Sequence, residues 1–282
     1  MLVRSLALLA ACLLAWPGYA QTLGKIAKTG VLTLGYTDGA APFSSGGVDG
    51  KPQGYSIDLC RAVADGIAAQ LGKPQLQTRW VKLTIQNRIE AVRRKQVDVE
   101  CGTTTWTLGR QRLVDFSLVT FVEGGSLLAR VQDGRLRSLK DFGGRRIAVI
   151  GGTTTEQALR DALSYAKVQA EVVLTSTRDE GLGLLRVGKV DGFASDRTTL
   201  LALVAKRSEG DMFRVLDEYF SIEQYALMLP RGDPDFRLAV NRTLARLYRS
   251  GDIQKVYDRW LGALGPPSAL LSSTYLIQSL EE

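Results

Sequence analysis

The stretch 86-QNRIEAVRRKQVDVECGTTTWTLGR-110 contains the pattern on which the fold depends. A short helical segment at 88–95 is followed by an apolar-alternating strand at 97–101, a glycine and three consecutive threonines. Threonine hydroxyls after a strand end, where backbone amides lack partners, suit the binding of a small carboxylate. Arg110 follows about one helical turn after a threonine cap, and a guanidinium can grip a carboxylate through two parallel hydrogen bonds. The stretch therefore predicts a strand-end pocket for a small carboxylate.

The alternation of strands and helices continues on both sides of this stretch. A first unit places strands at 30–36, 75–80 and 97–101, and helices at 22–29, 54–71 and 88–95. A second unit places strands at 143–150, 171–174 and 190–194, and helices at 151–163, 178–187 and 196–206. Because consecutive βα units lay their strands side by side beneath helices, the pattern predicts an α/β fold with largely parallel sheets and two lobes.

Composition and charge exclude several classes of protein. With 282 residues, 45% hydrophobic and 23% charged, the chain is ordinary for a soluble protein and long enough for two domains. The net charge of +7 comes from basic residues scattered among acids, so nucleic-acid binding is not expected. Histidine is absent, which excludes Ser-His-Asp and Cys-His catalysis, and the three cysteines have no zinc-site spacing. No metal or cofactor is expected.

Residues 1–20 have the pattern of a secretory signal peptide. Arg4 supplies the positive region, 5–16 the apolar region, and 18–20 a small-residue cleavage site before Gln21. Cleavage before Cys12, as in a lipoprotein, would leave an apolar region of only about seven residues, so lipidation is the less favoured outcome. No later segment is apolar over the roughly 20 residues of a membrane span. We expect an exported, soluble protein, in the periplasm if the host has two membranes.

Export to an oxidising compartment allows a disulfide between Cys60 and Cys101. The favoured interpretation is instead two separate buried thiols, with Cys60 on a helix and Cys101 at a strand end. Sequence spacing alone does not determine how far apart they lie.

From residue 21 onward the chain resembles the family 3 periplasmic solute-binding proteins, the amino-acid receptors of ABC importers, and within them the glutamate/aspartate-binding branch. The resemblance implies two lobes, each with a central mostly parallel sheet and flanking helices, joined by two hinge strands with the ligand in the cleft. Lobe one would comprise 21–120 and 223–282, and lobe two 121–222. The extended runs 116–122 and 218–225 would form the crossings, and the helices at 234–250 and 252–261 would rejoin lobe one.

The function implied is binding rather than catalysis. A monomer would capture an L-α-amino acid, with glutamate or aspartate favoured, and would deliver it to the permease subunits of an ABC transporter by hinge closure. The alternative hypothesis is an enzyme similar to the cyclohexadienyl dehydratases. These enzymes share the fold and need an acid in the cleft for proton transfer. Glu180 or Glu223 could be proposed for that acid, but neither lies in a recognisable catalytic motif. The tail from Gly265 onward is expected to pack on one lobe.

The resemblance also assigns roles to residues that would hold the α-amino and α-carboxylate groups. Arg110 would clamp the α-carboxylate, and Thr103 and Thr105 would donate to it and accept from the ammonium. Asp196 would pair with the ammonium. Two plain alternatives stay open, because Arg110 could be an exposed helix residue and Asp196 a helix N-cap.

Thr153 and Thr154 follow a glycine turn and begin a helix, where unpaired first-turn amides attract anions. A capping box formed by Thr153 and Glu156 explains the same pattern, and both interpretations can hold together. The resemblance implies that one of these threonines contacts the ligand.

Arg88 corresponds to the branch arginine that meets the distal carboxylate of the ligand. A second branch arginine is replaced here by Thr37, and a branch histidine by Arg178. A buried guanidinium needs an anion, which favours an acidic ligand. Arg178 could instead pair with a neighbouring acid (Asp179, Glu180 or Asp196) and leave room for a neutral polar side chain.

Phe43 and Tyr55 are aromatic residues that could form an apolar wall against the methylene groups of a ligand. We expect this contact for Phe43, and we expect Tyr55 to lie in the core of lobe one.

Overall fold

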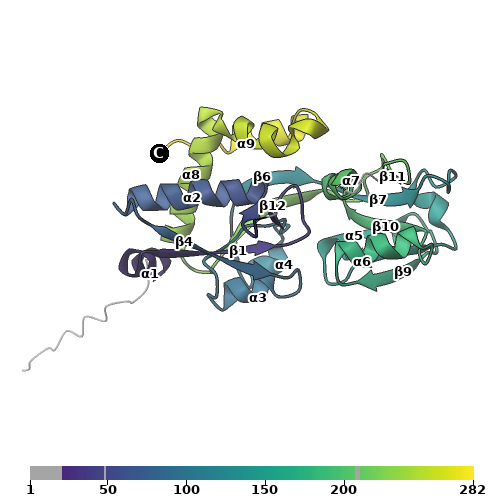
Figure 1. Cartoon of the computed structure of the whole chain (residues 1–282), viewed down its shortest axis with the longest axis horizontal. Helices are drawn as coiled ribbons and strands as arrows, with labels where there is room; N and C mark the ends of the chain where they lie inside the picture. Colours follow the sequence, from purple (N-terminus) through teal and green to yellow (C-terminus); the bar gives the residue numbers. More distant parts are fainter. Residues whose placement is uncertain (1–20, 48, 207–209) are drawn as a thin grey trace, which may run out of the picture.

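The structure is a computed structural model that describes residues 21–47, 49–206 and 210–282. The predicted signal peptide, with Cys12, lies outside the described residues. Two lobes lie side by side, each built on its own five-stranded sheet, and β6 and β12 extend from the first toward the second (Figure 1). No helix within the described ranges combines the length and the apolar character needed to cross a membrane.

Lobe one contains a mixed sheet in which one half is parallel and the other antiparallel. Its strand order is β4 (Gln77–Leu83), β1 (Val31–Thr37), β5 (Val99–Glu100), β12 (Glu223–Leu229) and β6 (Asp115–Glu123). Strand β1 is parallel to β4 and β5, whereas β12 is antiparallel to both of its neighbours. A small hairpin joins β2 (Ser45–Gly46) to β3 (Pro52–Gln53).

The helices of lobe one cover both faces of this sheet. They are α1 (Gln21–Thr29), α2 (Tyr55–Gln70), α3 (Arg88–Arg93), α4 (Leu108–Gln111), α8 (Pro234–Ser250), α9 (Asp252–Leu261), a 3-10 turn η2 (Gly262–Leu264) and α10 (Ala269–Ile277). In the view of Figure 1, α2 and α8 lie above the sheet, and α3 and α4 lie below it. On α2, Leu59, Val63 and Ile67 recur at i+4 steps and are all fully buried, so one face of the helix packs into the lobe.

Lobe two repeats the architecture. Its strand order is β11 (Phe213–Val215), β7 (Gly125–Arg130), β10 (Gly192–Asp196), β8 (Arg146–Ile150) and β9 (Glu171–Thr175). Strand β8 is parallel to β9 and β10, and β7 is antiparallel to β10 and β11. The helical elements are η1 (Leu139–Phe142), α5 (Thr154–Tyr165), α6 (Arg178–Arg186) and α7 (Arg197–Lys206). The predicted two-lobe α/β fold is confirmed, but each sheet is mixed rather than mostly parallel, with two parallel and two antiparallel strand pairs.

Strands β6 and β12 form the connection between the lobes. They pair antiparallel, and the last residue of β6, Glu123, lies opposite the first residue of β12, Glu223. The chain enters lobe two through Gly124 and Gly125. A Cβ atom on Gly124 would lie 2.6 Å from the backbone oxygen of Ser221, and one on Gly125 would lie 2.5 Å from the Phe220 ring. Glycine is therefore required at Gly124, where a Cβ atom would meet the backbone of the other crossing segment.

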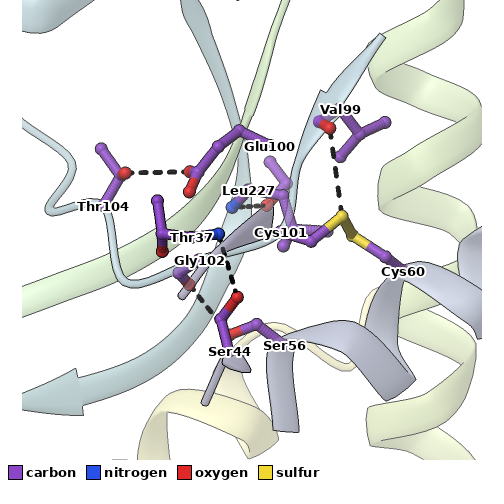
Figure 2. The surroundings of a disulfide bond; sticks show 11 residues. Thr37, Ser44, Ser56, Cys60, Val99, Glu100, Cys101, Gly102, Thr104 and Leu227 are labelled. Carbon is purple, nitrogen blue, oxygen red and sulfur yellow. Dashed lines mark hydrogen bonds between the residues drawn. A yellow bond between two sulfur atoms is a disulfide. The ribbon is translucent and has the colours of Figure 1, made fainter. Parts of the chain in front are cut away.

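A disulfide joins Cys60 on α2 to Cys101 just after β5 (Figure 2). The favoured interpretation of two separate thiols was wrong. Helix α2 packs against the end of β5 so that the two Cα atoms are 6.1 Å apart, within the range that a disulfide can bridge. That distance depends on how a helix and a strand pack, and a spacing of 41 residues carries no information about it.

The C-terminal tail packs on lobe one, as expected, and holds strand β6 in place. The Tyr275 hydroxyl lies 2.6 Å from that of Tyr55, which donates to the Thr120 carbonyl at 2.8 Å. The Gln278 amide accepts from the Val119 N–H at 2.7 Å and donates to the Val119 carbonyl at 3.0 Å. The tail thus satisfies backbone groups of the crossing strand that carries the chain toward lobe two.

Candidate functional site

A cavity lies between the lobes, where strands of both sheets end. Its volume is about 20 Å³, about enough for one water molecule, so its own side chains nearly fill it. Lobe one contributes Ile85, Arg88, Thr103, Thr105 and Glu223, and lobe two contributes Val149, Ile150, Thr153, Thr154, Thr155, Arg178, Ala194, Ser195 and Asp196. Ligands of open α/β sheets bind at such carboxyl ends. Seven of the nine residues predicted for the site therefore lie together: Arg88, Thr103, Thr105, Thr153, Thr154, Arg178 and Asp196.

The two lobes meet in this cavity through hydroxyl groups and one carboxylate. Thr105 of lobe one and Thr154 of lobe two lie 2.9 Å apart, oxygen to oxygen. Both donate to the same oxygen of Glu223, at 2.5 and 2.7 Å, and Thr155 donates to its other oxygen at 3.3 Å. From its place in the sequence, Glu223 was only a candidate acid of an enzyme, and its position in this cavity was missed. The signal in the sequence was a charged residue at the start of a largely apolar strand.

Thr153 caps helix α5 and also lines the cavity. Its hydroxyl accepts from the amide of Glu156 at 3.1 Å and donates to the Ile150 carbonyl at 2.7 Å. The Glu156 carboxylate in turn accepts from the Gly152 amide at 2.8 Å. The cap predicted at Thr153 is therefore present, although Glu156 accepts from the Gly152 amide rather than from that of Thr153. Contact of this turn with a ligand stays a prediction.

Arg88 and Arg178 are buried arginines, each the first residue of a helix. Their exposed fractions are 5% and 7%, and the Nε atom of each is buried without a hydrogen-bond partner. Burial lowers the pKa of Arg88, and the nearby charge of Glu100 opposes this effect. A positive charge at the N-terminus of a helix is unfavourable, and a buried guanidinium requires an anion. Both side chains are therefore better explained by the cavity than by the stability of their helices.

Arg178 forms an ion pair with Asp196, and both residues belong to lobe two and line the cavity. The Arg178 Nη2 atom lies 3.5 Å from Asp196 Oδ2. Burial raises the pKa of Asp196, the carboxylate of Glu223 raises it further, and Arg178 lowers it. The amide of Thr198 in the first turn of α7 donates to Glu123 at 3.1 Å. Asp196 thus faces the cavity and its arginine, and the capping of α7 involves a glutamate from the crossing strand.

Arg110 lies beside the cavity but is not one of the residues that line it. Its backbone amide donates to the Thr107 cap at 3.2 Å, and its Nη1 donates to the Thr105 carbonyl at 2.8 Å. Burial lowers the pKa of Arg110 to about 10, and the charge of Arg88 contributes in the same direction. The guanidinium therefore remains protonated at neutral pH and is tied to the threonine loop that forms the cavity wall.

Phe43 lies in the core of lobe one and is not among the cavity-lining residues. It is fully buried, and its ring centroid lies 4.8 Å from that of Phe121 and 5.5 Å from that of Tyr225. The prediction of an apolar wall against the ligand is corrected, because edge-to-face packing inside the lobe takes the ring away from the cavity. Tyr55 is also fully buried in this cluster, as predicted.

Glu123 gives the stability of the protein a distinctive pH dependence. Burial raises its pKa from 4.5 to about 7. Between these values the folded protein holds a proton that the unfolded chain releases, so stability should fall as the pH rises from 5 to 8, by about 3 kcal/mol from this group. Replacing Glu123 with glutamine should remove that part of the fall. Urea unfolding of both proteins at pH 5 and pH 8 tests this, and an equal fall in both would contradict it.

Comparison with known proteins finds relatives that match most of the chain. The chain is 34% identical to the L-glutamate/L-aspartate-binding protein of Pseudomonas aeruginosa over 250 residues, which cover 88% of this chain and 82% of the relative. It is 32% identical to a glutamate/aspartate import solute-binding protein of Salmonella typhimurium over 254 residues, 90% of this chain and 84% of the relative.

Solved structures with the same architecture also match. An ancestral arginine-binding protein bound to arginine superposes with a TM-score of 0.73 at 26% identity, covering 83% of this chain and 99% of the other. An ancestral amino acid-binding protein described as a precursor of cyclohexadienyl dehydratase gives a TM-score of 0.73 at 28% identity, covering 85% and 99%. The model of the bacterial extracellular solute-binding proteins, family 3, matches residues 32–263. With this match over most of its length, the chain belongs to the family 3 bacterial extracellular solute-binding proteins.

Proposed function

We propose that the protein is the extracytoplasmic receptor of an ABC importer and that it binds one L-α-amino acid, glutamate or aspartate in preference, in the cavity between the lobes. The observation that carries the proposal is the composition of this cavity. Two buried arginines, two buried carboxylates and a set of threonine hydroxyls face one space from both lobes. This set complements a molecule that carries both an ammonium and carboxylates.

The positions of the charges suggest how such a ligand is oriented. Arg110, together with the first-turn amides at Thr153 and Thr154, would hold the α-carboxylate. Asp196 would bind the ammonium, and Arg88 would meet the end of the ligand side chain. The names of the relatives from Pseudomonas aeruginosa and Salmonella typhimurium support an acidic ligand.

A neutral amide ligand, glutamine or asparagine, is the second candidate. It is favoured by the pairing of Arg178 with Asp196 at 3.5 Å, which partly neutralises one arginine before any ligand enters. Glu100 partly neutralises Arg88 in the same way, because Glu100 is fully buried and its charge interacts with the Arg88 guanidinium. A side chain without a charge would then be sufficient at the distal end.

Closure of the lobes would couple ligand binding to delivery. Contacts between the lobes already exist at Thr105 with Thr154, and at Gln86, whose amide donates to the Ser176 carbonyl at 3.2 Å. A ligand that contacts both walls stabilises the closed form relative to the open one. We propose that the closed monomer is the form recognised by the permease, in the periplasm of a host with two membranes. The buried disulfide is consistent with an oxidising compartment.

A dehydratase is the weaker alternative. The cavity contains two carboxylates, Asp196 and Glu223, that could transfer protons. The curated relatives are named as binding proteins, however, and the fold alone does not determine a reaction. Incubation with prephenate or arogenate should leave both compounds unchanged.

Titration calorimetry of the chain from Gln21 onward with each of the twenty L-amino acids tests the proposed function. We expect micromolar or tighter binding of glutamate or aspartate, and weaker binding of most others. Tight binding of glutamine or asparagine alone would select the second candidate. Failure of every amino acid to bind more tightly than millimolar would reject the receptor function.

A further inference from the structure

Glu223 stands at the point where the lobes converge. It is 3% exposed, begins the crossing strand β12 and lines the cavity. Its carboxylate accepts from Thr105 of lobe one and from Thr154 and Thr155 of lobe two. Ser221, two residues earlier, adds a longer contact of 3.4 Å. Hydroxyls from both walls of the cleft are therefore directed toward a single side chain.

The direction of these hydrogen bonds restricts what the threonines can offer to a ligand. A hydroxyl has one proton and two lone pairs, so a hydroxyl that donates to Glu223 can only accept from anything else. If Thr105 donates instead to Thr154, which donates to Glu223, the Thr105 proton is still used within the protein. Toward the cavity these oxygens present lone pairs, which suit a donor with several N–H groups and disfavour a carboxylate.

A second carboxylate strengthens the same preference. Asp196 lines the same small cavity as Glu223, and after burial the charge of Glu223 is the largest influence that raises the pKa of Asp196. An ammonium placed between them would satisfy both acids and the threonine oxygens. A ligand carboxylate in that position would meet only negative charge and lone pairs.

We propose that Glu223 is a specificity-determining residue that builds the ammonium subsite, together with Asp196, by fixing the hydroxyls of Thr105 and Thr154 as acceptors. This inference rests on the proposed amino-acid ligand and deepens it. It reverses part of the role implied by the family resemblance, because Thr105 accepts from the ammonium and does not donate to the α-carboxylate. The α-carboxylate then depends on Arg110 and the first-turn amides of α5.

The test compares each amino acid with its analogue that lacks the amino group. L-glutamate is paired with glutarate, and L-glutamine with glutaramate. Calorimetry should show that the wild-type protein prefers the amino acid by at least about 100-fold. In Glu223→Gln, the amide can donate to a threonine oxygen and turn that hydroxyl into a donor. The preference should therefore fall at least about tenfold, through weaker binding of the amino acid and equal or tighter binding of the analogue.

Glu123→Gln is the matched control. Glu123 is the cross-strand partner of Glu223 and is also buried, at 7% exposed, but it is not a cavity-lining residue. It should keep the wild-type preference. Thr154→Val, which removes one acceptor and leaves Glu223 in place, provides a second variant should Glu223→Gln fail to fold by circular dichroism. Thr154→Val should weaken the binding of the amino acid more than the binding of its analogue.

The outcomes separate this inference from the function on which it rests. A wild-type protein that binds neither amino acid overturns the proposed ligand and the inference together. A wild-type protein that binds, with an unchanged preference in Glu223→Gln or in Thr154→Val, overturns the role of Glu223 alone. An equal loss of preference in Glu123→Gln would also overturn it, because the effect would then belong to any buried carboxylate at the crossing.

Discussion

Arg110→Lys should weaken amino-acid binding by about a hundredfold, although the positive charge is kept. A guanidinium can hold both oxygens of a carboxylate, whereas an ammonium acts as a single point charge. Charge-assisted hydrogen bonds contribute roughly 1.5 to 3 kcal/mol each, and lysine can keep one of the two, so the loss should be about 3 kcal/mol. In the structure the guanidinium is held by the Thr105 carbonyl at 2.8 Å, in a position that lysine cannot reproduce with the same planar group.

The measurement is calorimetric titration with the ligand identified for the wild-type protein. Arg112→Lys is the matched control, because Arg112 ends the same short helix and is exposed. The control should bind as the wild type does. Affinity of Arg110→Lys within about threefold of the wild type would show that Arg110 is a structural residue of the threonine loop and does not bind the α-carboxylate.

Removal of the Cys60–Cys101 disulfide should cost about 4 kcal/mol of folding free energy. The bridge closes a loop with a sequence separation of 41 residues, and restriction of a loop of that size in the unfolded chain accounts for this amount. Both cysteines are fully buried, so Cys60→Ala with Cys101→Ala avoids an unpaired hydroxyl in the core. The melting temperature should fall by about 10 °C.

Scanning calorimetry with and without a reductant provides the control. Reductant should lower the melting temperature of the wild-type protein after prolonged incubation and should leave that of the double variant unchanged. A double variant that melts within about 2 °C of the oxidised wild type would mean that packing of α2 on β5 is sufficient and that the bridge adds little.

Several elements were predictable because their signals are local. Helices α8 and α9 have the bounds predicted for them, 234–250 and 252–261. Asp233 caps α8 by accepting from the Phe236 amide, Pro234 occupies the first turn, and Gly251 ends the helix with φ of 78°. Where such signals are weaker the bounds shift. Helix α3 ends at Arg93 rather than at 95, and Lys95 already has a positive φ of 56°.

The composition of the site was predictable for a related reason. Strands that end at glycine, threonine or aspartate bring polar residues to the carboxyl edge of a parallel sheet, so residues far apart in sequence gather at one edge. This rule, together with the family resemblance, was sufficient to name Thr103, Thr105, Thr153 and Asp196. It could not reveal Glu223, because that residue begins a strand rather than following one, and its strand runs antiparallel to its neighbours.

The sequence by itself determined the two βα units, their order, and which polar residues stand at the strand ends, because periods of 2 and about 3.6 residues and the capping residues act within a few positions of one another. Only the tertiary structure decided that Cys60 and Cys101 form a disulfide and that Phe43 packs in the core of lobe one. It also decided that Arg178 pairs with Asp196 and that three threonine hydroxyls donate to Glu223. These contacts join different elements, and some join different lobes. They arise from the packing of sheets and helices against one another. No local pattern in the sequence specifies the distance between two residues on different elements.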